Sequence, residues 1–555
     1  MTSRPRRLWP VVAAGALVAL AALFVAVPLA KRAATRPELL GLDPAIGQPG
    51  STIRVFGRNF GQDRGDGRVE FDGESLTASS YLSWKDDVIE VRVPLYAQNC
   101  TVHVVTEAGR SNPRMFLSRD RLPVSAAGGG ASSVGPRVDS LSVERGAIGS
   151  VLTIRGLNFG LNRDTSSVQF GWESAASVFS GGPDQDTRGN VTPLDEDGEY
   201  LSWSDKEIRV VVPDGAVSGS LSVRTDRGSS SGRYFEIVDM PGTKTYSDRR
   251  TYALRSFVSI SRVQATPGNT LHLWLPFPAS SAWQKGVKVL SRSHEPLVPE
   301  YRGLSVYRLG DLAKDKLLTV SQDFLVQVHA VSTDIKPERV KAPPSPAPPV
   351  YQLYTSDDGL APSTDADVKA FAAKAAGRER NPYRVAKLLW DALLGAVEYD
   401  PAARSSKPAA ALKGGKADAW DLSLLYVAML RASGIPARPV AGILVDEDVR
   451  AWSHAWAEFY LYGFGWVPAD PALGTGAAPG GTTPAFEDPK RYFGNLDARH
   501  VAYSRGLTRV SPMTPDSRPV GADRRYSMQT IYEEGQGNLT SYTSFWSDVE
   551  VTGVY

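Results

Sequence analysis

Cysteine is almost absent from this chain of 555 residues, which contains Cys100 and no other thiol. A single thiol excludes an intrachain disulfide and a cysteine-based metal centre, and it argues against a small secreted domain held by disulfides. Histidine is also scarce, and five of the six lack the spacing of metal ligands: His103, His272, His294, His329 and His500. We therefore expect no metal and no other cofactor.

An excess of charge of one sign is missing as well. The chain has 62 basic and 60 acidic residues, which gives a formal net charge of +2. This balance gives no reason to expect a nucleic-acid partner. A length of 555 residues exceeds what one hydrophobic core supports, so three or four domains are expected.

One long uncharged run stands near the N-terminus, from Leu8 to Ala30, after Arg4, Arg6 and Arg7. At about 1.5 Å rise per residue, a helix of this length crosses a hydrocarbon core of roughly 30 Å. We expect residues 1–37 to form a transmembrane signal anchor. A cleaved signal peptide is the alternative. In both cases the bulk of the chain is extracytoplasmic, in a periplasm or on a cell surface, and the anchor makes it a single-pass membrane protein.

Two segments of the chain repeat. Gly50–Gly61 matches Gly149–Gly160 at an offset of 149 − 50 = 99, and Tyr81–Trp84 matches Tyr200–Trp203 at an offset of 200 − 81 = 119. The second copy therefore carries an insertion of 119 − 99 = 20 residues, near 180–199. Short runs of alternating apolar and polar residues, separated by Gly and Asn, are typical of half-buried strands.

The repeats resemble IPT/TIG domains, and the resemblance rests on Pro44, Gly50, Gly57 and Phe60-Gly61 with their second copies. It implies two immunoglobulin-like β-sandwiches, at residues 38–121 and 136–240, joined by a flexible linker at 122–135. The insertion is acidic and lacks a complete calcium-binding pattern, so we predict a solvated loop around Asp184, Asp186, Asp195 and Asp197.

The second half of the chain changes from strand to helix patterns. Residues 241–340 are β-rich, and 341–350 form a proline-rich spacer expected to be extended and unpacked. The segment Ser363-Thr364-Asp365 is expected to cap a helix that runs through Ala376 and is stopped by Gly377, and Pro382 to begin the next. We assign 351–500 to an α+β core and 501–555 to a C-terminal β extension.

Three stretches of this core have the order and spacing of a cysteine enzyme. They are Gly415–Asp421 before an apolar helix, Ser453-His454-Ala455-Trp456, and Gly465–Pro471. Such an enzyme needs a thiolate at a helix N-terminus, an imidazole to take its proton, and a carboxylate to orient the imidazole. The chain resembles the transglutaminase-like, papain-related superfamily, and this resemblance implies that Cys, His and Asp belong at positions 419, 454 and 470.

Position 419 is an alanine, so the degenerate triad is Ala419, His454 and Asp470. A methyl group cannot attack a carbonyl. Ser423, one helical turn further, is expected to be hydrogen-bonded within the helix, and Cys100 lies in a different predicted domain. A groove around the site would be lined by Trp420, Asp418, Ser453 and Trp456.

The sequence thus predicts a multidomain, membrane-anchored pseudoenzyme of a bacterial envelope. It would bind a peptide, a protein or a cell-wall ligand, or act as a scaffold, without processing it. One alternative is an active hydrolase or acyltransferase of altered chemistry that uses His454 and Asp470 without a cysteine. The other is a structural adhesion or spacer protein that acts through its IPT domains.

Overall fold

A computed structural model describes residues 36–94, 97, 100–118, 135–175, 187–404, 407–477, 479–514, 517–521 and 525–555. The predicted membrane segment and most of the predicted linker at 122–135 lie outside these ranges. No helix in the described part of the chain combines the length and apolarity needed to span a membrane. The chain divides into two compact units, Met1–Gly129 with Ser511–Arg518, and Gly130–Val510 with Pro519–Tyr555.

The first repeat (residues 38–118) consists of two sheets. One has the order β1-β3-β7-β6, with strands Glu38–Asp43, Thr52–Arg58, Val88–Arg92 and Tyr81–Trp84. The other has the order β2-β10-β8-β4-β5, with strands Ile46–Gly47, Arg114–Ser118, Cys100–Thr106, Arg68–Phe71 and Glu74–Ser75, and β9 (Gly109–Arg110) beside β8. Alternate residues are buried, as Ile53 and Val55 are on β3, because successive side chains of a strand face opposite sides.

The second repeat (residues 137–237) has the same strand order. Its first sheet is β11-β13-β17-β16, at Arg137–Leu141, Val151–Leu157, Glu207–Val211 and Tyr200–Trp203. Its second is β12-β20-β18-β14-β15, at Arg145–Gly146, Arg233–Ile237, Gly219–Thr225, Ser167–Glu173 and Arg188–Val191, with β19 (Gly228–Ser229) beside β18. The offset of 99 places β3 on β13, and the offset of 119 places β6 on β16, so the repeat read from the sequence is confirmed in three dimensions.

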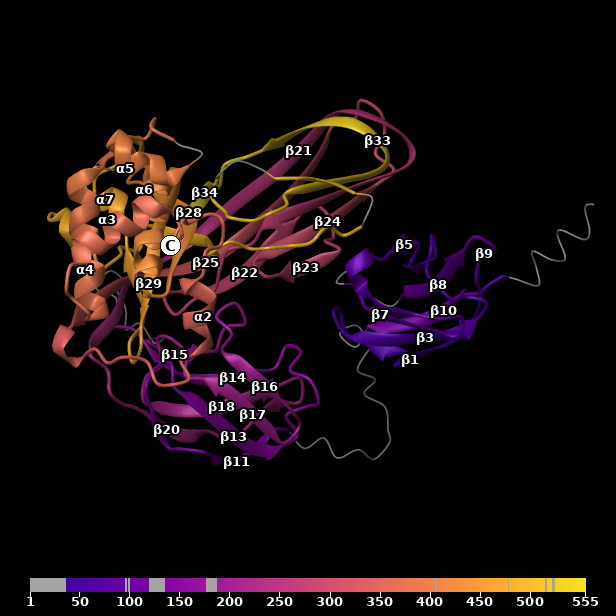
Figure 1. Ribbon diagram of the computed structural model, residues 1–555, viewed down its shortest axis with the longest axis horizontal. Helices are drawn as coiled ribbons and strands as arrows, with labels where there is room; N and C mark the ends of the chain where they lie inside the picture. The colour runs from indigo at the N-terminus through magenta and orange to yellow at the C-terminus, as the bar shows by residue number, and fades with distance from the viewer. Residues whose placement is uncertain are drawn as a thin grey trace, which may run out of the picture. The chain divides into compact units, whose positions relative to one another are not determined.

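A large sheet follows, and the C-terminus returns to it. Its central strands are β22 (Gln284–Arg292), β25 (Leu318–Ile335), β21 (Gly242–Pro276), β24 (Leu304–Gly310) and β23 (Val298–Tyr301). The last strands, β33 (Glu533–Trp546) and β34 (Glu550–Val554), both pair with β21, and β32 (Arg518–Val520) pairs with β33. Figure 1 shows β33 running alongside β21. The sheet is therefore assembled from segments on either side of the helical part.

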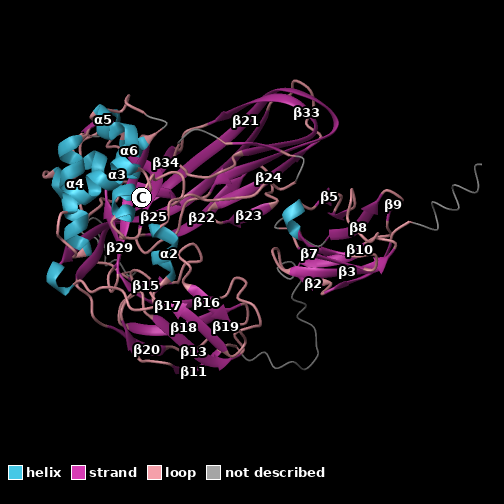
Figure 2. Ribbon diagram, viewed as in Figure 1, coloured by secondary structure: helices cyan, strands magenta, loops and turns pink. Residues whose placement is uncertain are grey.

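The helical part packs on a small sheet. The helices are α2 (Pro349–Thr355), α3 (Ala366–Ala376), α4 (Pro382–Ala396), α5 (Ala411–Gly414), α6 (Ala419–Ala432) and α7 (Pro471–Gly474). The sheet has the order β30-β29-β28-β31, at Gly465–Ala469, Ala451–Leu461, Ala437–Val445 and His500–Arg505. Strands β26 (Glu398–Tyr399) and β27 (Lys416–Ala417) form a separate two-stranded sheet. Figure 2 shows α3, α4, α5 and α6 gathered in one group.

The predicted helix signals are confirmed. The Asp365 carboxylate accepts the backbone N–H groups of Asp367 and Val368 and caps α3, and Gly377 ends that helix at φ +55°. Pro382 occupies the first turn of α4.

Two segments depart from the expected boundaries. Pro348 and Val350, in the segment expected to be unpacked, are buried. Helix α2 begins at Pro349, because proline suits a first helical turn. Strand β31 runs across the predicted boundary between residues 500 and 501. It completes the sheet of the helical part by pairing with β28. The C-terminal segment therefore begins inside the core.

Candidate functional site

Ala419 is the first residue of α6 and is buried, with 6% of its surface exposed. Asp418 is the residue before the helix, and its carboxylate accepts the backbone N–H of Asp421 at 2.8 Å. A thiolate at position 419 would lie at the positive end of a helix of 14 residues, which lowers a thiol pKa. The methyl group of alanine supplies no lone pair and no proton.

Helix α6 packs along β29 in the same direction as the strand. In its second turn, the Ser423 hydroxyl donates to the carbonyl of Ala455 at 2.9 Å. In its last turn, Arg431 Nε donates at 2.8 Å to the carbonyl of Ala437, whose partner on β29 is Phe459. The contacts therefore advance along the strand as they advance along the helix.

This direction places Ala419 toward the His454 end of β29, since it precedes Ser423 by one turn, about 6 Å. It also decides the role of Ser423. The serine is fully buried and its proton is held by a neighbouring strand, whereas the sequence predicted a bond within the helix. A hydroxyl held in this way is a structural contact between α6 and β29.

His454 and Asp470 form the expected pair. His454 Nε2 donates to Asp470 Oδ2 at 2.6 Å, because a carboxylate can only accept. Asp470 Oδ1 accepts the backbone N–H of Leu473 at 3.0 Å, so the same carboxylate caps α7. His454 Nδ1 is buried and has no hydrogen-bond partner among the described residues. The imidazole is thus oriented by its carboxylate and keeps a free lone pair, as a general base requires.

A second histidine completes this cluster, and the sequence did not single it out. His500 Nε2 donates to Asp470 Oδ2 at 3.1 Å, and its Nδ1 donates to Asp497 Oδ1 at 3.1 Å. Burial alone would lower the pKa of His500, but Asp497 and Asp470 outweigh it and raise the pKa to about 9. The same histidines help to hold the pKa of the Asp470 carboxyl below its ordinary value, although burial opposes this. His500 is therefore an imidazolium that stabilises the orienting carboxylate.

The side-chain atoms of His454, Asp470 and His500 lie within 4.8 Å of one another, close enough for a metal ion. Two histidines and a carboxylate are also a donor set that zinc accepts. However, both ring nitrogens of His500 and Nε2 of His454 are already engaged in hydrogen bonds with carboxylates. We therefore interpret these residues as a hydrogen-bonded cluster.

The four predicted groove residues are not alike. Trp456 is fully buried, with ring centroids 6.2 Å from Trp283 and 5.2 Å from His500, so it belongs to the core and faces no solvent-filled groove. Trp420 packs in a small buried cluster with Ala441, Ala455 and Met528. Asp418 caps α6, and Ser453 is the exposed member of the four.

The strands of the site are fixed to the second repeat by buried charges. Arg438 on β28 donates to Asp197 Oδ1 at 2.5 Å and to Glu458 Oε2 on β29 at 2.9 Å. Trp466 on β30 donates to Asp197 Oδ2 at 3.0 Å. Asp197 is 2% exposed, so the prediction of a solvated acidic loop is wrong at this residue. A buried arginine side chain needs carboxylate partners, and the inserted segment supplies one of them, Asp197.

Comparison with known proteins identifies the class of the helical part. Residues 369–471 match the family model of the transglutaminase-like superfamily, a stretch that contains positions 419, 454 and 470. The protein therefore contains a transglutaminase-like domain within a β-rich, multidomain chain.

Individual relatives cover only part of the molecule. An uncharacterized protein of Haemophilus influenzae is 33% identical over 140 residues, 20% of this chain and 37% of that protein. A cyclomaltodextrin glucanotransferase of Paenibacillus macerans is 33% identical over 93 residues, 16% of this chain and 13% of that enzyme. The solved structure of a candidate cysteine protease from Cytophaga hutchinsonii has 15% identity and a TM-score of 0.38, and it covers 56% of this chain and 92% of that one. The chain thus spans little more than a third of the Haemophilus protein and far less of the glucanotransferase.

Proposed function

We propose that the transglutaminase-like domain is a pseudoenzyme that binds a peptide, protein or cell-wall ligand, or acts as a scaffold. The observation that carries the proposal is Ala419, the first residue of the helix that packs along the strand of His454. A cysteine enzyme needs a nucleophile at that point. Ser423 donates its proton to a strand, and Asp418 caps the helix, so neither replaces the thiolate.

The rest of the triad supports loss of the nucleophile within a retained scaffold. The His454–Asp470 pair is buried, caps α7, and is braced by His500. Removing such a network would leave buried polar groups without partners, which costs about 1–3 kcal/mol for each group. The pair therefore has a structural reason to persist without catalysis.

A wider proposal concerns the location of the protein in the cell and the class of its repeats. We infer that residues 1–37 anchor the protein in the membrane and that the remainder is extracytoplasmic. We infer also that the repeats are immunoglobulin-like IPT/TIG domains. Strand β3 of the first repeat and the equivalent strand β13 of the second both bury alternate residues, which supports this assignment.

The test is a pair of variants of the full chain. The unmodified protein should give no glutamine–amine acyl transfer and no peptide hydrolysis, and Ala419→Cys should gain one of these activities. Ala419→Ser is the matched control, because it adds a polar group of similar size with a much weaker nucleophile. Turnover by the unmodified protein, abolished in His454→Ala, would refute the proposal.

A second candidate rests on the free Nδ1 of His454. This nitrogen belongs to an imidazole oriented by Asp470, so it has the arrangement of a base that activates water in a hydrolase without a cysteine. His454→Gln would then abolish hydrolysis in a chain that still carries Ala419. If neither protein hydrolyses ester or amide substrates, this candidate is excluded.

A further inference from the structure

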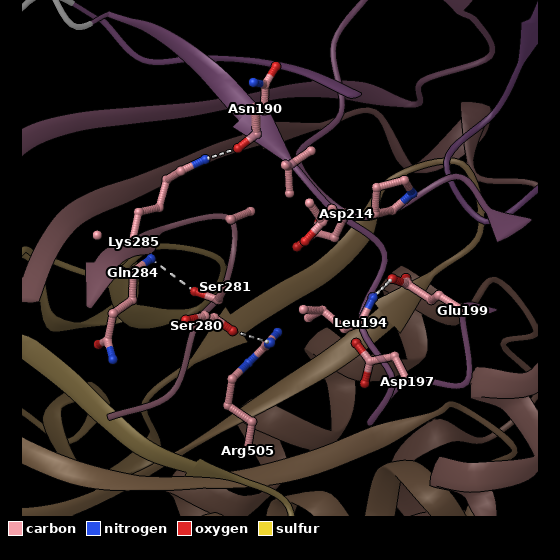
Figure 3. Close-up of a pocket in the computed structure, with 15 residues that line it drawn as sticks. Asn190, Leu194, Asp197, Glu199, Asp214, Ser280, Ser281, Gln284, Lys285 and Arg505 are labelled. Carbon is pink, nitrogen blue, oxygen red and sulfur yellow. Dashed lines mark hydrogen bonds between the residues drawn. The ribbon is translucent and has the colours of Figure 1, made fainter. Parts of the chain in front are cut away.

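A polar pocket of about 160 Å³ lies where the second repeat meets the large sheet and the transglutaminase-like domain. Figure 3 shows Lys285 on one side, Glu199 and Asp197 on the other, Asp214 between them, and Arg505 below. Asn190 and Ser280 at its edge are exposed, whereas Glu199 and Gln284 are buried. The pocket therefore opens to solvent and has a buried floor.

Most charges around the pocket are already paired with groups behind its wall. Asp214 binds Lys244 at 2.5 Å, and Asp197 binds Arg438 at 2.5 Å. Arg505 donates to Glu458, with 3.3 Å between Nε and Oε2. These pairs leave no surplus charge to attract an ion.

Lys285 and Glu199 differ, since neither forms an ion pair with any described residue. Lys285 Nζ donates to the carbonyl of Asn190 at 2.5 Å and lies 4.0 Å from the centre of the Trp172 ring. Glu199 Oε2 accepts the backbone N–H of Leu194 at 2.7 Å. Each side chain therefore keeps hydrogen-bonding capacity that is directed at no protein partner.

Burial disfavours the charged form of both groups. Burial lowers the pKa of Lys285 to about 8. Burial raises the pKa of Glu199 well above its ordinary value, and the neighbouring Asp197 and Asp214 raise it further. The charges of Asp214, Asp197 and Arg505 are already paired, so a fully charged ligand would lose its hydration here for little electrostatic gain. A neutral ligand that both donates and accepts hydrogen bonds avoids this cost.

The side chains of Asn190 and Thr192, which also line the pocket, add an amide and a hydroxyl without a hydrogen-bond partner among the described residues. Donors and acceptors thus both line a space of about 160 Å³. That is the size of one sugar ring, whose hydroxyls can each donate and accept.

We propose that this pocket binds a neutral polyhydroxylated ligand, a single sugar ring, between Lys285 and Glu199. The site is independent of the triad positions and does not rest on the pseudoenzyme proposal. Lys285 donates to ring hydroxyls, and Glu199 exchanges hydrogen bonds with them from the floor.

The test is calorimetric titration of the full chain with glucose, galactose and N-acetylglucosamine, and with glucuronate and lysine as charged probes. At least one neutral sugar should bind in the millimolar range. Lys285→Met should weaken that binding about tenfold, as expected for loss of about 1.4 kcal/mol. Lys288→Met is the matched control, an exposed lysine on the same strand, and should leave Kd unchanged.

Glu199→Gln distinguishes binding of neutral ligands from binding of charged ligands, because the glutamine side chain can form hydrogen bonds but cannot carry a charge. A neutral sugar should bind this variant within about twofold of the unmodified protein. The proposal is overturned if no neutral sugar binds, if only glucuronate or lysine binds, or if Lys285→Met and Lys288→Met behave alike while both remain folded by circular dichroism.

Discussion

The two repeats have one fold and two different relations to the rest of the chain. Their strands have the same order, and a tyrosine hydroxyl accepts a strand N–H at the same point in each. Tyr81 accepts from Val69, and Tyr200 accepts from Val168. Yet the first repeat belongs to one compact unit together with Ser511–Arg518, whereas the second belongs to the unit that contains the transglutaminase-like domain.

The second repeat shares an apolar core with the rest of its unit, and buried charges add to this contact. The inserted segment brings Asp197 to Arg438, and the turn after β17 brings Asp214 to Lys244 on β21. The internal architecture of the repeat is unchanged by these contacts. The second repeat is thus held to its neighbour by buried charges on its loops as well as by their shared apolar core.

The largest expected effect follows from breaking this junction. Asp197→Ala removes the partner of Arg438 and of the Trp466 indole and leaves a buried guanidinium short of one carboxylate. Breaking a buried pair in this way costs about 3–5 kcal/mol. We expect the free energy of unfolding of the second unit, measured by urea denaturation, to fall by that amount.

The matched control is Glu207→Ala in the same repeat. Its partner is Arg155, and their side chains are 42% and 63% exposed. An exposed pair contributes only about 0–1 kcal/mol. Equal losses in the two variants would mean that the junction adds nothing to the stability of the unit.

A second experiment probes the junction through two glycines of nearly equal φ. Gly73 in the first repeat has φ +87° and nothing within 4 Å of an added Cβ. Gly465 has φ +86°, but an added Cβ would lie 2.1 Å from Asp214 Oδ1. Gly73→Ala should cost about 1–2 kcal/mol for the left-handed backbone alone. Gly465→Ala should cost about 1–3 kcal/mol more, because it also overpacks the junction.

Thermal unfolding of the two variants, each compared with the unmodified protein, measures the difference. If both alanines lower stability equally, the close approach at Gly465 is relieved without cost and the junction is looser than its contacts imply.

Much of the fold follows from local signals in the sequence. Asp365 and Gly377 mark the ends of α3 because caps act within one turn. The repeat is visible because both copies keep the same turn glycines. The positions 419, 454 and 470 are assigned through the resemblance of their motifs to the transglutaminase-like superfamily, and the family match over residues 369–471 agrees with this assignment.

What the sequence concealed is long-range. Asp197 and Arg438 are 241 residues apart, and an ion pair between distant segments produces no periodic pattern. His500 looks isolated along the chain, and only the pairing of β31 with β28 brings it to Asp470. The one local hint was Asp497, three residues earlier, since a carboxylate at that distance can orient an imidazole.

Low pH should reduce the stability of the junction at the second repeat through Glu458, and it should leave the first repeat little affected. Burial alone would raise the pKa of this carboxyl, but Arg505 and Arg438 outweigh it and lower the pKa to about 2, from 4.5. A lowered pKa contributes stability that is complete above pH 4.5 and is lost as the pH falls through about 2. The loss amounts to about 3 kcal/mol.

Denaturation from pH 7 to 2.5 of the unmodified protein and of Glu458→Gln measures this contribution. The stability difference between the two proteins should shrink as the pH falls. The exposed Asp43–Arg54 pair of the first repeat is the comparison, and Asp43→Asn should have little effect at any pH. A pH-independent difference for Glu458→Gln would show that its carboxylate is not the charged partner of Arg438.

The smallest expected effect comes from the tyrosine hydrogen bond that both repeats contain. Tyr81→Phe and Tyr200→Phe each remove one hydroxyl that bonds a strand N–H, at 2.8 Å to Val69 and 3.1 Å to Val168. Each should cost about 1 kcal/mol, because a hydrogen bond is lost within otherwise unchanged packing. Hydrogen exchange at the Val69 and Val168 amides should accelerate by a similar factor in the two variants. A much larger effect at Val168 would mean that docking on the neighbouring domain has altered the interior of the second repeat, and the equivalence of the two folds would then end at their strand order.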